Sequence, residues 1–340
     1  MKVETILWLL GAGITGVLGL LVWLLLRWRV TASAQRAAPV RLGAQREIPP
    51  VLMPVALTRL GPYQIERELG RGSMGVVYQG YELDGGRAVA LKTMALVNEF
   101  DEEALADARS RFFREAETAI RLQHVGIVKA YASGEDQDLA WIAMEYLSGQ
   151  PLTQWTLPEQ LLPLPDALMV VRLAALALDY AHRQHVVHRD IKPANLMYDP
   201  DTRKVKLTDF GVARLTDANR TRTGLVLGTP AFMSPEQLAG QHIDARSDLY
   251  SLGVTLYQLT TGHLPFMADS LGQLMYAITH ESPQDPRIAN PRLPAVLAEI
   301  ILKAVQKDAS MRFQNGAQFA LALARLEVVL KGRTPHAKPA

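Results

Sequence analysis

The sequence of 340 residues contains no cysteine. A chain without cysteine forms no disulfide bond, binds no metal through thiolates and uses no cysteine nucleophile. The absence of disulfides is compatible with a reducing cytosol. The sequence also lacks any internal repeat. Stability must therefore come from non-covalent packing, and chemistry from oxygen and nitrogen groups.

The sequence also lacks a strong charge of either sign. Its 36 basic and 34 acidic residues leave a net charge of +2, and no dense basic stripe stands out. Nucleic-acid binding is therefore not predicted. A hydrophobic content of 49% and a charged content of 21% are globular values. The length suits one large domain with two lobes or two ordinary domains.

One long uncharged run, residues 6–26, stands out near the N-terminus. At about 1.5 Å per residue, a helix of this length spans a hydrocarbon core of roughly 30 Å. A cleavable signal peptide is the alternative, with a cleavage pattern at 32–34. The hydrophobic part of a signal peptide usually has only about 7–15 residues, and Arg27 and Arg29 follow this run. We therefore predict an uncleaved transmembrane anchor.

The arginines beside this run predict its orientation. Only Lys2 precedes the run, whereas five arginines follow it: Arg27, Arg29, Arg36, Arg41 and Arg46. Positive charge favours the cytoplasmic side. We expect a single-pass protein of the inner or plasma membrane with its C-terminal part in the cytoplasm. Small residues four apart, such as Gly11 and Thr15, permit close approach of two such helices and predict a homodimer.

Periodicity beyond residue 62 predicts an α+β fold. Short alternating runs separated by glycine-containing turns predict strands, and longer amphipathic runs predict helices. The expected strands are 63–69, 75–82, 88–94, 127–133 and 139–144. The expected helices are 102–122, 167–184, 247–261, 271–279 and 295–307.

The most informative motif is the segment 188–195, which reads HRDIKPAN, with DFG following at 209–211. Together they supply a candidate proton acceptor, a lysine and two oxygen ligands for Mg²⁺. Phosphoryl transfer needs such a set, because the charge of a polyanionic donor must be neutralised while a hydroxyl attacks in line. The pattern resembles the eukaryotic-type (Hanks-type) serine/threonine protein kinases, in particular the bacterial membrane-anchored kind.

This resemblance implies an architecture as well as a chemistry. A small β-rich N-terminal lobe joins a larger helical C-terminal lobe in the protein-kinase fold. The predicted organisation is an anchor, a linker rich in proline, arginine and alanine, the kinase domain with its two lobes, and a tail. Their ranges are 1–30, 31–62, 63–330 (lobes 63–147 and 148–330) and 331–340.

The resemblance also assigns roles within the motif. Asp190 accepts or orients the hydroxyl proton of the substrate, and Lys192 contacts the γ-phosphate, as in kinases specific for serine and threonine. Asn195 and Asp209 supply oxygen ligands to Mg²⁺, with Mn²⁺ as an alternative ion. The implied reaction transfers phosphate from ATP to serine or threonine side chains of protein substrates.

Three histidines, His182, His185 and His188, recur at every third residue near this motif. The spacing invites interpretation as a metal site. A better explanation is that His182 lies at the end of a helix, His185 lies in the turn after it, and His188 packs inside the catalytic loop.

A second motif, GRGSMGVV at 70–77, resembles the glycine-rich loop of kinases through Gly70, Gly72 and Gly75. Rossmann folds use a similar string, so the motif alone is weak. Here a strand-like run follows it instead of a helix, and no acidic residue stands at a second strand end. Lys92 follows at the family spacing, and it is predicted to hold the α- and β-phosphates.

The helix predicted at 102–122 should supply a carboxylate to pair with Lys92. Glu115 is the expected partner, and Glu117 is the alternative, whose ordinary interpretation is a solvated helix charge. By the same resemblance, the backbone of Glu145 and Leu147 binds adenine, and apolar side chains surround it. The remaining predicted nucleotide contacts are Leu69, Val77, Ala90, Met144 and Leu196.

The segment 211–236 corresponds to the activation segment of the family. Thr221 and Thr223 are its predicted autophosphorylation sites, and Arg189 is the cation that such a phosphate neutralises. Two structural contacts are also implied: Glu236 with Arg312, and Asp248 with the catalytic loop. Ser234 stands where the family usually has alanine.

Two alternatives to a protein kinase remain open. A pseudokinase scaffold would bind partners without catalysis, although the catalytic positions of this chain hold competent residues. A kinase-like phosphotransferase acting on small molecules would share the nucleotide machinery, but such enzymes usually lack a segment like 228–236.

Overall fold

The computed structural model describes residues 57–72, 75–95, 102–136, 138–210 and 230–332. The predicted anchor at 6–26, the phosphorylation sites Thr221 and Thr223, and most of the predicted tail lie outside these residues. No helix among the described residues combines the length and the apolar character needed to cross a bilayer. The predicted two-lobed architecture is confirmed for the described part of the chain.

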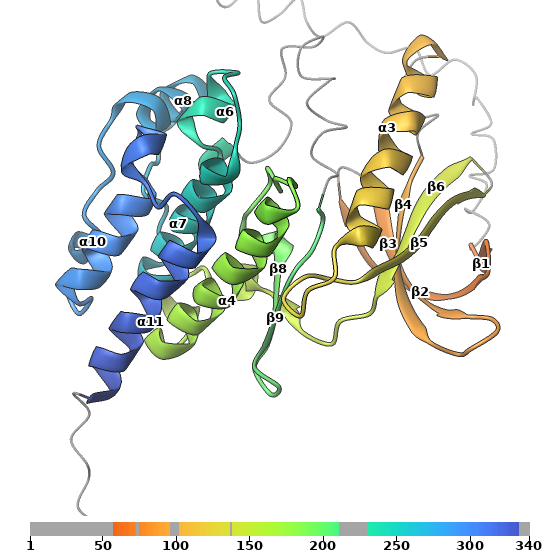
Figure 1. Ribbon diagram of the computed structural model, residues 1–340, viewed down its shortest axis with the longest axis horizontal. Helices are drawn as coiled ribbons and strands as arrows, with labels where there is room; N and C mark the ends of the chain where they lie inside the picture. The colour runs from red at the N-terminus through yellow and green to blue at the C-terminus, as the bar shows by residue number, and fades with distance from the viewer. Residues whose placement is uncertain (1–56, 73–74, 96–101, 137, 211–229, 333–340) are drawn as a thin grey trace, which may run out of the picture. The chain divides into compact units, whose positions relative to one another are not determined.

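The N-terminal lobe is built on a six-stranded sheet with the order β1-β2-β3-β4-β6-β5 and antiparallel pairing throughout (Figure 1). The strands are β1 (Arg59–Leu60), β2 (Tyr63–Gly72), β3 (Gly75–Glu82), β4 (Ala88–Met94), β5 (Ala130–Asp136) and β6 (Leu139–Glu145). The strands predicted at 75–82 and 88–94 match β3 and β4. Strand β1 lies in the last part of the predicted linker, where buried Leu60 packs with Tyr63 and Trp141.

Strand β5 begins three residues later than the alternating pattern predicted. The backbone of the preceding segment pairs instead with the C-terminal lobe, where Val128 N–H donates to Leu207 O at 2.8 Å and Leu207 N–H donates to Gly126 O at 2.9 Å. A local pattern cannot show this pairing, because its partner lies about 80 residues away in the chain.

Helix α3 (Glu102–Arg121) covers one face of the sheet (Figure 1). Phe112 and Ala116 are buried, and they pack against Met94 of β4 and Ile142 of β6. Burial of one helical stripe against a sheet removes apolar area from water at about 25 cal/mol per Å². The helix predicted at 102–122 is confirmed, with its end one residue earlier.

Helices α4 and α7 form the centre of the C-terminal lobe. Helix α7 is buried at almost every position. Asp244 caps its N-terminus, where the carboxylate accepts from Arg246 N–H, and Gly262 with φ of 76° caps its C-terminus. The helices of this lobe are α4 (Leu164–Arg183), α6 (Pro235–Leu238), α7 (Ala245–Thr261), α8 (Leu271–His280), α9 (Pro286–Ala289), α10 (Ala295–Ala304) and α11 (Gly316–Gly332).

Helix α11 packs along α4 (Figure 1), and its Ala- and Leu-rich sequence is absent from the predicted helices. Its first residue, Gly316, lies so close to α4 that an added Cβ would be 2.1 Å from Ala175 O. Asp179 of α4 accepts from Ala317 N–H at 3.1 Å. The start of α11 is therefore fixed by a close backbone approach.

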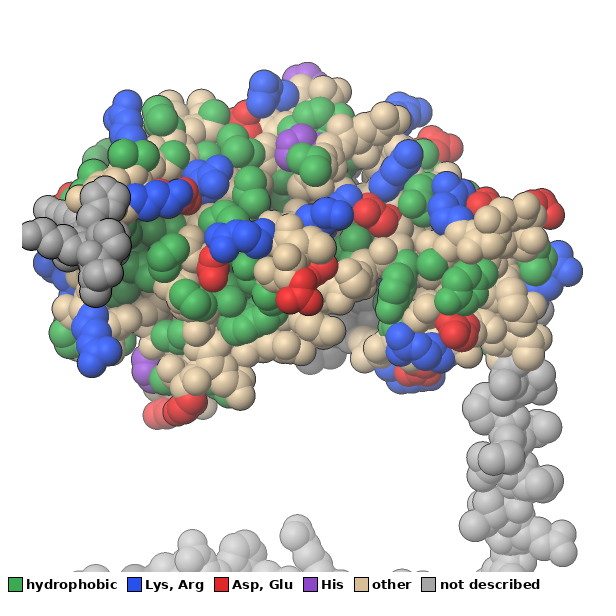
Figure 2. Space-filling view, turned by 90° about the horizontal axis from the view of Figure 1, so that it is seen from below, with side chains coloured by type: hydrophobic (Ala, Val, Ile, Leu, Met, Phe, Trp, Pro, Cys, Tyr) green, Lys and Arg blue, Asp and Glu red, His purple; other side chains and the backbone are tan. Residues whose placement is uncertain are grey.

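A small three-stranded sheet, β7 (Gln150–Pro151), β8 (Leu196–Asp199) and β9 (Lys204–Leu207), lies between α4 and the N-terminal lobe (Figure 1). On the face seen in Figure 2, lysine and arginine side chains are spread among acidic and hydrophobic ones and form no continuous stripe among the described residues.

Candidate active site

The predicted proton acceptor, Asp190, lies in a short hydrogen-bonded cluster. The 3₁₀ turn Pro193–Asn195 brings Asn195 back towards it, so that Asn195 Nδ2 donates to Asp190 Oδ2 at 2.9 Å and to Asp190 O at 2.7 Å. Lys192 Nζ lies 2.8 Å from Asp190 Oδ2. Two donors thus hold the Asp190 carboxylate in one orientation, and three of the predicted site residues meet here.

Asp248, in the first turn of α7, holds the backbone of the two residues before Asp190. This carboxylate is buried, and it accepts from His188 N–H at 2.8 Å and from Arg189 N–H at 2.7 Å. Arg189 has a φ of 69°, which an L residue adopts only where its surroundings fix it. His182 Nε2 also lies 2.7 Å from Asp248 Oδ2. The predicted contact between Asp248 and the catalytic loop is therefore present.

His188 is fully buried within the same loop. Its Nδ1 accepts from Asp190 N–H at 3.3 Å, so its Nε2 carries the proton that is donated to Thr208 O at 2.7 Å. Its ring packs on Phe210 with centroids 4.5 Å apart. His185 is exposed, so the three histidines have three different settings. Among the described residues, no group of three or more His, Cys, Asp or Glu side chains could hold a metal ion.

Lys92 of β4 contacts the other lobe directly. Its Nζ lies 2.5 Å from Asp209 Oδ1, and Asp209 has a φ of 63°. Burial raises the pKa of Asp209, but the charge and hydrogen bond of Lys92, with His188 and Lys192 nearby, bring that pKa below its ordinary value. Asp209 is therefore ionised near neutral pH, as a cation ligand must be.

Glu115 and Glu117 occupy different sides of α3. Glu117 is exposed and lies 3.9 Å from Arg121 on the same helix, which fits a solvated helix charge. Glu115 lines a cavity of about 420 Å³ together with Val187 and Arg189. Lys92 and Asp209 line a different cavity, so the pairing of Lys92 with Glu115 stays a prediction.

Of the predicted adenine contacts, Met144, Glu145 and Leu147 lie where β6 leaves the sheet. Ala90 pairs with Met144 across β4 and β6, and Leu196 begins β8 with its side chain buried. Met144 lines a cavity of about 30 Å³ with Lys92 and Asp209. Glu145 is the last residue of β6, and Leu147 lies two residues later. Val77 pairs with Lys92 across β3 and β4, and Leu69 lies on β2.

The glycine-rich motif lies at the turn between β2 and β3, and residues 73–74 are outside the described part. Apart from each glycine and its chain neighbours, no atom of the described residues lies within 4 Å of the place where a side chain at Gly70 or Gly72 would begin. Gly75 has a φ of 129°, and an added Cβ would lie 1.8 Å from Thr93 O. Only glycine fits that position next to β4.

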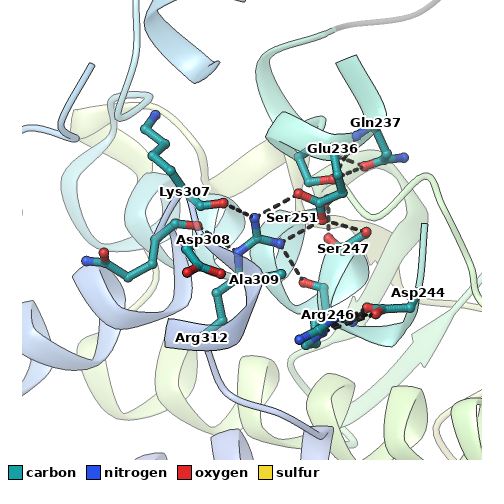
Figure 3. A network of polar contacts seen from close by, with 12 residues as sticks. Glu236, Gln237, Asp244, Arg246, Ser247, Ser251, Lys307, Asp308, Ala309 and Arg312 are labelled. Carbon is teal, nitrogen blue, oxygen red and sulfur yellow. Dashed lines mark hydrogen bonds and ion pairs between the residues drawn. The ribbon is translucent and has the colours of Figure 1, made fainter. Parts of the chain in front are cut away.

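Glu236 and Arg312 form the predicted pair (Figure 3). Arg312 Nη1 and Nη2 donate to the two carboxylate oxygens at 2.7 and 2.8 Å, and Ser247 Oγ adds a bond of 2.6 Å. Burial raises the pKa of Glu236, but the hydrogen bonds from Arg312 and Ser247 lower it below the ordinary value. The Arg312 guanidinium also donates to the backbone oxygens of Gln306 and Lys307.

Gln237 is a residue that the sequence interpretation missed. Ser234 Oγ accepts from Gln237 N–H, Gln237 Oε1 accepts from Ser234 N–H, and Gln237 Nε2 donates to Arg189 O at 2.9 Å. The spacing of Ser234 and Gln237 is a capping-box signal that was available in the sequence. It explains the serine found where the family usually has alanine.

Comparisons with known proteins agree with this geometry. Residues 63–320 match the protein kinase domain family. Serine/threonine-protein kinase PknJ of Mycobacterium tuberculosis is 40% identical over 268 residues, which cover 77% of this chain and 45% of PknJ. The chain spans 38% of the length of one curated relative that it matches and 64% of another.

Two solved structures share the fold. The Mycobacterium tuberculosis PknI kinase domain has a TM-score of 0.63 at 30% identity, covering 78% of this chain and 97% of that one. Rad53 1–466 in complex with AMP-PNP has a TM-score of 0.64 at 25% identity, covering 78% and 65%. With a family match over most of its length and these relatives, this chain belongs to the protein kinase family.

Proposed function

We propose that this protein is an ATP-dependent serine/threonine protein kinase. The observation that carries the proposal is the contact of Lys92 with Asp209 across the lobes, beside the cluster of Asp190, Lys192 and Asn195. Serine/threonine kinases among its relatives, and the AMP-PNP bound to Rad53, support the same nucleotide chemistry.

The arrangement can position both reactants. The Asp190 carboxylate, held by Asn195 and Lys192, can accept a hydrogen bond from a substrate hydroxyl and take its proton as the phosphate transfers. In this role, Lys192 would face the negative charge that develops on the transferred group. Lys92 offers a point charge to the α- and β-phosphates from the opposite lobe.

Asp209 and Asn195 fit a Mg²⁺ site. Asn195 donates both of its bonds to Asp190 through Nδ2, which leaves the amide oxygen for a cation, and Asp209 is ionised. Mg²⁺ usually takes one or two protein oxygens and completes its shell with phosphate and water. The bound ion would neutralise charge on the phosphates, and Mn²⁺ has the same preference for oxygen.

Transfer of label from γ-labelled ATP tests the function directly. The wild-type protein should label itself and a serine/threonine protein substrate, and Asp209→Ala should abolish labelling. Asp201→Ala, an exposed acid in the turn between β8 and β9, is the matched control and should retain it. A wild-type protein that binds ATP but labels nothing would indicate a pseudokinase scaffold. Labelling of small molecules alone would indicate the other phosphotransferase class.

We further propose that residues 6–26 anchor the protein in the inner or plasma membrane with the kinase domain, 63–330, in the cytoplasm. The uncharged run and the arginines after it support this topology. Protease digestion of sealed membrane vesicles and of spheroplasts tests it. Digestion of the kinase domain from the outer face would contradict the orientation, and recovery of the whole protein in the soluble fraction would contradict the anchor.

Two regulatory proposals concern the same chain. Thr221 and Thr223 are proposed to be autophosphorylated, and the added phosphate is proposed to contact Arg189. Mass spectrometry of active protein should find both sites modified, and finding neither would contradict the proposal. A homodimer through the small residues of 6–26 is proposed as well, and crosslinking in membranes that yields only monomers would contradict it.

A further inference from the structure

Lys206 lies where three segments of the chain meet. Strand β9 carries it, the segment 126–129 pairs with β9 through Leu207, and the end of β6 lies beside both. Lys206 Nζ lies 2.5 Å from Glu145 Oε2 and 3.4 Å from Ile127 O. The same Glu145 oxygen accepts from Lys129 N–H at 3.3 Å. One lysine therefore joins the C-terminal lobe to the end of β6 and to the segment that leads into β5.

The pair is sheltered from solvent. The side chain of Lys206 is 16% exposed and that of Glu145 is 30% exposed. Water and salt screen an ion pair with this little exposure less than they screen a surface pair. The pair therefore constrains the positions of its two side chains more strongly. Lys204, two residues earlier on the same strand, is exposed and provides a natural comparison.

Residues 145–149 connect the two lobes, and the hairpin formed by β8 and β9 also holds the far end of this connection. Ser148 Oγ lies 3.1 Å from Asp199 Oδ2 at the end of β8. Gly149 lies so close to β8 that an added Cβ would be 2.8 Å from Tyr198 O. Residues 145–149, which connect the lobes, are thus fixed to the β8–β9 hairpin at both ends.

The hairpin also carries the proposed metal ligands. Asn195 directly precedes β8, and Asp209 stands two residues after β9. The proposed adenine contacts at Glu145 and Leu147 lie in the connection that the hairpin holds. Because one hairpin contacts both sets, its contacts set the distance between the adenine end and the phosphate end of a bound nucleotide.

We infer that Lys206 is a positioning residue, which through Glu145 fixes the adenine-binding backbone relative to Asn195 and Asp209. This inference rests on the proposed function. A nucleotide that spans both ends should depend on this distance, whereas adenosine, which contacts only the adenine end, should not.

The test compares binding of Mg–ATP and of adenosine to the full chain by titration calorimetry, together with KM and kcat. Lys206→Met should weaken Mg–ATP binding about five- to tenfold, on the scale of a partly buried charge pair, and should change adenosine binding less than about twofold. KM for ATP should rise in parallel, with kcat changed less than KM. Lys206→Arg should restore most of the Mg–ATP affinity, and Lys204→Met should behave as wild type.

Glu145→Gln keeps the volume of the partner and should give the same selective loss, even if Lys206→Met does not fold. Unchanged Mg–ATP affinity in both variants would overturn the inference. An equal loss of adenosine and Mg–ATP affinity would also overturn it, because that pattern indicates general damage. A wild-type protein that binds neither ligand refutes the proposed function itself, and this inference with it.

Discussion

Two ion pairs in this molecule differ in how completely they are satisfied. Lys92 and Asp209 meet through one short contact at the boundary of the lobes, and the Asp209 side chain is 30% exposed. Arg312 and Glu236 meet through two parallel bonds, and the Arg312 side chain is 0% exposed. The first pair has capacity left for a phosphate or a cation, whereas the second has its donors used within the protein.

We infer that the difference separates residues proposed to act in catalysis from residues that stabilise the fold. A buried charge that loses its partner stays in the protein with a large desolvation cost. A charge at a partly open cleft can exchange its partner for a ligand at little cost. We therefore expect changes at Arg312 to affect stability and changes at Lys92 to affect activity.

The largest expected effect on stability comes from Arg312→Met. It leaves Glu236 buried without its bidentate partner, which should lower the free energy of unfolding by about 3–5 kcal/mol. Urea denaturation of the wild type and the variant measures the difference. Exposed Arg114→Met on α3 is the control and should stay within about 0.5 kcal/mol of wild type. A loss below about 1 kcal/mol for Arg312→Met would show that the network is not structural.

Lys92→Met should show the opposite pattern. Removal of one preorganised charge at a phosphoryl-transfer site should lower kcat/KM by about 10²- to 10³-fold. The free energy of unfolding should fall less than in Arg312→Met, because Asp209 is partly exposed and water can replace part of the lost contact. Kinetic assays with a peptide substrate and urea denaturation of the same sample test both halves. If instead stability falls as far as in Arg312→Met, the proposed division between the two pairs is wrong.

Acid should weaken the buried pair in a predictable window. The folded-state pKa of Glu236 lies below its ordinary value of 4.5, so the unfolded state binds the proton first as pH falls. The stabilisation is therefore complete above about pH 5 and is lost as pH falls through 4.5 towards the folded pKa. Unfolding free energies measured from about pH 7 to pH 3 should fall more steeply for wild type than for Glu236→Gln. Parallel curves would contradict this linkage.

The sequence was most informative where residues act through local motifs. The strands at 75–82 and 88–94 and helix α3 follow from periodicity, and the cluster around Asp190 follows from the resemblance of its motif to protein kinases. The shift of β5 and the contact of Lys206 with Glu145 depend on pairing between lobes, which no local pattern encodes. Helix α11 was missed although Phe319, Leu323 and Leu326 repeat at helical spacing.

The smallest expected effect isolates the connection between α6 and the catalytic loop. Ser234 caps α6, as Ser270 caps α8, so replacing either serine with alanine should cost about 1 kcal/mol of unfolding free energy. Only Ser234 also holds Gln237, whose Nε2 reaches Arg189 O at 2.9 Å. Ser234→Ala should therefore lower kcat by about two- to fivefold, because a displacement of Arg189 moves Asp190 next to it. Ser270→Ala should leave kcat unchanged. Equal kcat values in the two variants, at equal loss of stability, would show that α6 does not help to position the catalytic loop.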